Sequence, residues 1–89
     1  MNTLFDNLKG VTVDHNGDLK NEEDVKEGIV YLMYTEYDEF RCLDREPSYK
    51  VRVLKKVNGE ILNCMTDTRR WRDTIQDFVD HSIAEINAN

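Results

Sequence analysis

The chain has 89 residues, of which 39% are hydrophobic and 34% charged, with one proline and four glycines. This is the composition of one folded domain, and it excludes a disordered or low-complexity chain. The formal net charge is −6 and no apolar run could span a bilayer, so we expect a soluble cytoplasmic protein with no membrane partner.

The charge is distributed unevenly along the chain. Residues 1–48 hold 12 acidic and 5 basic residues, a net charge of −7, whereas residues 49–89 hold 6 and 7, a net charge of +1. An acidic half attracts basic surfaces and repels nucleic acid over long range, so this asymmetry bears directly on the class of partner.

The first segment, NTLFDNLKG, predicts a short helix that Asn2 caps, with Gly10 in the left-handed conformation past its end. Asn16-Gly17 then favours a two-residue hairpin turn between strands at 11–15 and 18–20.

The same stretch, from Asp14, begins like a calcium-binding loop. Leu19 stands where that loop requires glycine, and Val25 stands where it requires a bidentate glutamate. We therefore expect a turn here and no metal site.

Residues 22–43 allow two interpretations. Three acids after Asn21 are typical of a helix start, and a helix continued to residue 43 would align several apolar residues but place Glu36 among them. The alternative ends the helix at Gly28 and makes IVYLMYT a strand, because its residues are mostly β-branched or aromatic. We favour the strand, followed by a second short strand near EFRCL. Tyr31 and Tyr34 would then face opposite ways.

The clearest pattern is SYKVRVLKKVNGEILNCMT, two β-rich runs around Asn58-Gly59. A two-residue loop pairs Val57 with Glu60, Val53 with Cys64 and Val51 with Thr66. One face of this hairpin is apolar and should meet the core. The other face is basic but partly apolar, so it is either half covered or a contact surface; it carries Lys50, Arg52, Leu54, Lys56, Ile61, Asn63 and Met65.

Residues 67–87 predict a helix, because Trp71, Ile75, Phe78, Val79 and Ile86 recur at helical spacing. Trp71 is therefore expected in the core. The arginines around it, Arg69, Arg70 and Arg72, would point to different sides of the helix start. The predicted fold is a single α+β domain over residues 1–89, with an antiparallel sheet of Asn-Gly hairpins packed against this amphipathic helix.

Catalytic motifs are missing from the sequence. It has no phosphate-binding glycine loop, no GxSxG and no HExxH. His15 and His81 have the settings of ordinary surface histidines, and Cys42 and Cys64 are expected to be reduced thiols. We expect no catalysis, no cofactor and no bound metal.

The first functional hypothesis is a small acidic, non-catalytic protein-binding module. It would be an inhibitor or regulator that engages a basic site on a protein partner, such as a site that otherwise holds nucleic acid. The predicted partner-binding residues are Asp18, Glu22, Glu23, Asp24, Glu27, Glu36, Asp38 and Glu39.

Two alternatives stay open. The first is a nucleic-acid binder that uses Lys50, Arg52, Lys56, Arg69, Arg70 and Arg72; the net charge of −6 and a buried Trp71 count against it. The second is a homodimer, formed either by the basic hairpin face against the acidic half or by a symmetric contact through Leu54, Ile61 and Met65.

Overall fold

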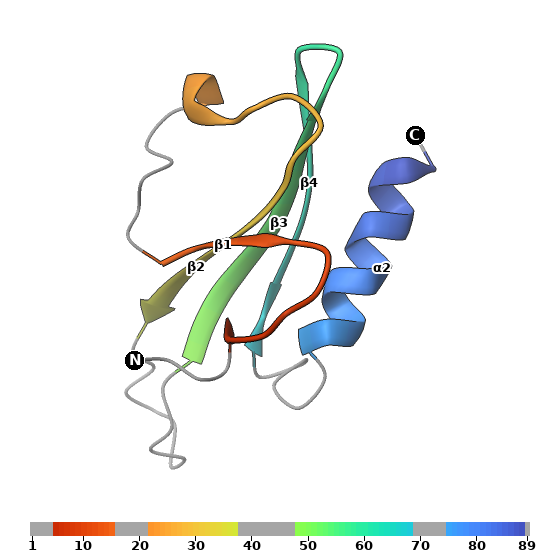
Figure 1. Ribbon diagram of the computed structural model, residues 1–89. Coiled ribbons are helices and arrows are strands. Elements are labelled where there is room, and N and C mark those ends of the chain that lie inside the picture. Colours follow the sequence, from red (N-terminus) through yellow and green to blue (C-terminus); the bar gives the residue numbers. More distant parts are fainter. Residues whose placement is uncertain (1–4, 16–21, 38–47, 69–74, 89) are drawn as a thin grey trace.

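The computed structural model describes residues 5–15, 22–37, 48–68 and 75–88, which form a four-stranded sheet with one helix packed across it (Figure 1). The elements are β1 (Thr12–Asp14), the 3₁₀ turn η2 (Glu22–Asp24), β2 (Val30–Tyr37), β3 (Ser48–Val57), β4 (Glu60–Asp67) and α2 (Ile75–Asn87). The strand order is β1-β2-β3-β4. The predicted α+β class is confirmed.

The β3–β4 hairpin forms as the sequence predicts. Asn58 and Gly59 have φ angles of 53° and 81°, the left-handed values that a tight hairpin turn requires. The register pairs Val57 with Glu60, Val53 with Cys64 and Val51 with Thr66, so the predicted register is confirmed. We call the side of the sheet that α2 covers the helix face and the opposite side the back face.

β2 settles the ambiguity of residues 22–43 in favour of a strand. The helical start at Glu22 lasts only as far as Asp24, and Gly28, with a φ of 82°, lies before the chain enters β2. β2 pairs antiparallel with β3 along its whole length, and Tyr31 and Tyr34 contribute to different apolar clusters. A continuous helix over this region is wrong, and the second strand expected near residues 39–43 lies outside the described residues.

β1 has a partner that we did not expect. It pairs with β2, and the two strands are parallel, with Val13 beside Leu32. The antiparallel partner predicted at 18–20 lies outside the described residues. The physical reason for the observed pairing is burial: Val11 and Val13 pack against the main core from this position, whereas an isolated hairpin is only marginally stable.

The predicted amino-terminal helix ends earlier than we expected: Phe5 has 3₁₀ geometry, residues 2–4 lie outside the described residues, and the part of the prediction beyond Asp6 is wrong. The backbone turns at Asn7, which has a φ of 63°, so no helix continues to Lys9. Gly10 does take the predicted left-handed conformation, with a φ of 87°. Phe5 is buried in the core, and Lys9 exchanges two hydrogen bonds with the Gln76 side chain of α2, at 2.8 and 3.0 Å.

The main core lies between the helix face and α2. Ile75, Phe78, Val79 and Ile86 are buried there, as their spacing predicts, against strand residues such as Val53. Trp71 lies outside the described residues. Of the helices in the described part, none combines the length and apolar character that crossing a bilayer requires.

A second, smaller core covers part of the back face. Val25, in the segment between η2 and β2, packs with Tyr31 and Leu54, and Met33 and Ile61 pack around them. Leu54 is only 2% exposed. The back face of the hairpin is therefore half covered, which was one of the two possibilities that its mixed composition allowed.

Candidate functional site

The η2 turn carries three consecutive acidic residues on the surface of the described chain. Glu22, Glu23 and Asp24 follow one another and are all exposed to solvent. Directly after them, the buried Val25 donates its amide to the Glu22 carbonyl at 3.2 Å and anchors the turn on the back face. A short helical turn thus presents three adjacent carboxylates from a fixed backbone. We call these three residues the acidic turn.

Glu27, also a predicted partner-binding residue, is exposed, but its carboxylate already binds another part of the same chain. Its two carboxylate oxygens accept hydrogen bonds from the backbone amides of Asn58 and Gly59 at the β3–β4 turn, the latter at 3.2 Å. The Gly28 amide next to it donates to the Lys56 carbonyl at 3.0 Å. Glu27 therefore binds the hairpin turn, and its charge is partly compensated there.

The remaining predicted acidic residues do not join this surface within the described structure. Glu36 is exposed near the far end of β2, six positions beyond Val30, which is about 20 Å along an extended strand. Asp18, Asp38 and Glu39 lie outside the described residues. The eight residues that composition grouped together thus include one exposed triplet, one carboxylate bound to the hairpin turn and one distant residue.

Lys50, Arg52 and Lys56 of β3 share the back face, as alternation predicts, but they do not form a continuous cationic strip. The buried Leu54 separates Arg52 from Lys56. Arg52 lies between Met33 and Met65 in the strand register and is only partly exposed. Its Nε is buried and has no hydrogen-bond partner within the described structure. Arg69, Arg70 and Arg72 lie outside the described residues.

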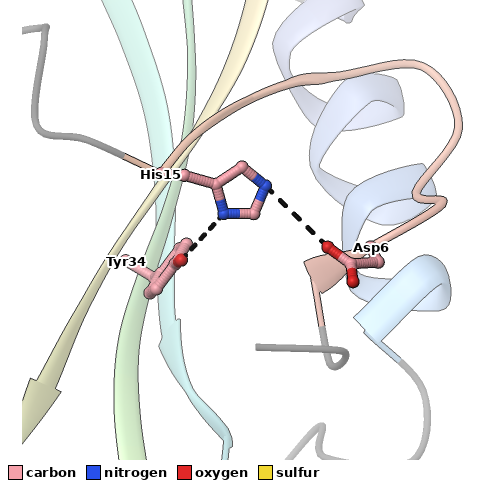
Figure 2. A network of polar contacts seen from close by, with 3 residues as sticks. All are labelled: Asp6, His15 and Tyr34. Carbon is pink, nitrogen blue, oxygen red and sulfur yellow. Dashed lines mark hydrogen bonds and ion pairs between the residues drawn. The ribbon is translucent and has the colours of Figure 1, made fainter. Parts of the chain in front are cut away.

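A polar network that the sequence did not suggest joins three segments on the helix-face side of β2 (Figure 2). His15 Nδ1 lies 2.9 Å from the Tyr34 hydroxyl, and His15 Nε2 lies 4.0 Å from Asp6 Oδ1. The Tyr34 ring stacks on Phe5 with centroids 4.0 Å apart, and it makes a T-shaped contact with the Tyr49 ring. Residues this far apart in the chain leave no local pattern, so no sequence signal could have found the network.

The chemistry available to this network is limited by its geometry. At 4.0 Å, Asp6 is too far from His15 for a hydrogen bond, and it interacts as an ion pair only when the imidazole is protonated. The His15 side chain is 42% exposed, so solvent screens this interaction. We interpret the network as a structural contact that holds the amino-terminal turn and the end of β1 against β2.

Metal binding finds no support in the described part of the chain. Within it, no three His, Cys, Asp or Glu side chains come close enough together to hold an ion. Cys64 is a free thiol, half-buried under α2.

Comparison with protein-family models, with curated proteins and with solved structures gave no match for this chain.

Proposed function

We propose that this protein is a non-catalytic protein-binding module that presents the acidic turn, Glu22, Glu23 and Asp24, to a basic site on a protein partner. The observation that carries the proposal is the exposure of three adjacent carboxylates on a backbone anchored by Val25. A pre-positioned cluster loses little conformational freedom on binding, which favours affinity.

The charge of the whole chain also favours a partner with a basic surface. A net charge of −6, with the first half more acidic than the second, attracts a basic surface from a distance and raises the association rate at low salt. A site that otherwise holds nucleic-acid phosphates is one such surface, and occupying it would make the protein an inhibitor or regulator of its partner.

Nucleic acid itself is the weaker candidate ligand. On the back face of β3, Leu54 separates Arg52 from Lys56, and Arg52 lies between Met33 and Met65 in the strand register. A nucleic-acid surface needs several cations free to reach successive phosphates.

Affinity capture from a lysate of the native host, with and without nuclease, tests the proposal. Three baits are needed: the unchanged protein, the variant E22K/E23K/D24K, and the control D77K/D80K/E85K, which makes the same charge change on exposed positions of α2. We expect a protein that survives nuclease and is retained by the unchanged and control baits but lost from the acidic-turn variant. Equal retention by all three baits, or capture that disappears with nuclease, contradicts the proposal.

A further inference from the structure

The two edges of the sheet differ in how well they resist pairing with another strand. β1 is only 3 residues long, and a short edge strand presents few unpaired backbone groups. β4 is 8 residues long, and among the described residues its only strand partner is β3. The residues between its two terminal acids, ILNCMT, are uncharged and include no proline, and its register with β3 runs without a bulge. Over its described length, β4 therefore lacks the internal charges, proline and bulges that commonly prevent edge-to-edge association.

The backbone groups on the outer edge of β4 belong to its odd-numbered residues. In a hairpin with a two-residue turn, the residues that flank the turn, here Val57 and Glu60, form the first hydrogen-bonded pair. Alternation then directs the amides and carbonyls of Ile61, Asn63 and Met65 away from β3. These groups form a row that an antiparallel strand can bind.

The side chains along this edge are suited to contact. On the back face, Met65 is 66% exposed and Asn63 is exposed, while Ile61 is half-buried at the margin of the small core. Leu54, which the sequence analysis grouped with Ile61 and Met65 as a symmetric apolar contact, is buried beneath Val25. The apolar residues that remain available for a partner lie on β4.

We infer that β4 pairs antiparallel with β4 of a second copy of this chain, about a two-fold axis at Asn63, so that the two sheets continue into one. In this register Ile61 of one copy faces Met65 of the other on the back face, and Leu62 faces Cys64 on the helix face. In an isologous contact residue i meets residue j and residue j meets residue i, so only Asn63, on the axis, faces its own copy, and here each apolar side chain meets an apolar one.

The neighbouring registers are less favourable. An axis at Cys64 places Ile61 against Asp67 of the second copy, and an axis at Leu62 places Glu60 against Cys64. Both set a carboxylate against an apolar side chain inside the contact, which costs desolvation without a compensating partner. With the axis at Asn63, Glu60 faces the hydroxyl of Thr66 instead.

The geometry of α2 agrees with such a contact. A two-fold axis perpendicular to the sheet keeps both helices on the same face, and α2 packs over β3 and β4, so the two copies of α2 would be neighbours across the axis. The interface is formed mainly by one strand edge, which places it among small and reversible contacts. We therefore expect a dimer that dissociates on dilution. It uses none of the acidic turn, so its outcome is independent of the proposed function.

Variants that introduce opposite charges at Asn63 test the two-fold symmetry directly. Their association is measured by sedimentation velocity over a series of protein concentrations. We expect the unchanged protein to associate as its concentration rises. Asn63→Lys and Asn63→Asp each place two like charges opposite one another and should raise the dimer dissociation constant at least tenfold. An equimolar mixture of the two variants should associate again, because the introduced lysine then faces the introduced aspartate.

The matched control is Thr35, which is exposed on the same face but in β2, on the side of β3 opposite to β4 and so remote from the outer edge of β4. Thr35→Lys and Thr35→Asp should leave association unchanged. A protein that stays monomeric at all concentrations overturns the inference. So does unaltered association of both Asn63 variants, and so does a mixture that stays monomeric.

Discussion

The Glu27 carboxylate accepts a hydrogen bond at 3.2 Å from the backbone amide of Gly59, 32 residues further along the chain, and its other oxygen accepts one from Asn58. Asn58 and Gly59 both have positive φ, and successive amides in such a turn form a small concavity that binds an anion. Glu27 provides that anion from within the chain. The contact fixes the segment before β2 against the tip of the β3–β4 hairpin.

Glu27→Ala should lower the free energy of unfolding by about 1–2 kcal/mol, because two turn amides lose a charged acceptor and solvent replaces it only partly. Glu27→Gln keeps one acceptor oxygen, so its free energy of unfolding should lie between those of Glu27→Ala and the unchanged protein. Urea unfolding followed by circular dichroism measures both. Glu23→Ala, at an exposed position of η2, should change stability by less than about 0.5 kcal/mol; equal losses for Glu23 and Glu27 would show that the turn contact contributes nothing.

Alanine substitutions at Gly10 and Gly59 distinguish the stability cost of backbone strain from that of steric contact. Both have positive φ, 87° and 81°, but a Cβ at Gly59 would meet open space, whereas one at Gly10 would lie 3.0 Å from Ile83 Cδ1. Gly59→Ala should therefore cost about 1 kcal/mol, from backbone strain alone, and Gly10→Ala should cost more. In the Ile83→Val background, which lacks Cδ1, the excess cost of Gly10→Ala should disappear. An excess that persists in that background would place its origin elsewhere.

The back-face core can be tested by truncating two side chains of the hairpin. Leu54→Ala should reduce the free energy of unfolding by about 2–4 kcal/mol, because Leu54 is 2% exposed and packs with Val25 and Tyr31. Met65→Ala, on the same face but 66% exposed, should cost less than about 0.5 kcal/mol. The comparison requires a protein concentration at which both variants are monomeric. Similar costs for the two would mean that the back face holds no core of its own.

The elements that the sequence predicted well are those whose information is local. The β3–β4 hairpin follows from Asn58-Gly59 and from strict alternation over a few residues on either side, and the register follows from the turn length. The apolar stripe of α2 is likewise local. The parallel pairing of β1 with β2 could not be derived in this way, because it depends on which distant strand best buries Val11 and Val13.

The site could be predicted only in part, for a related reason. Composition indicated acidic residues on the surface, and Glu22, Glu23 and Asp24 are exposed. Composition could not distinguish these three residues from Glu27. The carboxylate that binds the hairpin turn is selected by a contact between residues 31 and 32 positions apart in the chain. Leu54 was placed on the outer face by alternation, correctly, but alternation does not reveal that Val25 returns to cover it.

Ser82 and Thr68 are both fully buried hydroxyl residues, and the structure predicts opposite effects on removing the two hydroxyl groups. Within the described structure Ser82 Oγ has no hydrogen-bond partner, whereas Thr68 Oγ1 accepts a hydrogen bond at 3.0 Å from the Tyr49 amide. Ser82→Ala should raise the free energy of unfolding by about 0.5–1.5 kcal/mol, since an unpaired buried hydroxyl is costly and alanine is the better helix former.

Thr68→Val should lower the free energy of unfolding by about 1–3 kcal/mol. The Tyr49 amide would lose Thr68 Oγ1 as its acceptor, while the side-chain volume stays nearly the same. Urea unfolding of both variants, analysed with a common slope, gives the two signs in one experiment. A loss of stability in Ser82→Ala would show that its hydroxyl finds a partner in solution, such as a buried water or the carbonyl one helical turn earlier. Stability unchanged by Thr68→Val would show that this hydrogen bond contributes nothing to folding, because solvent replaces it at the Tyr49 amide.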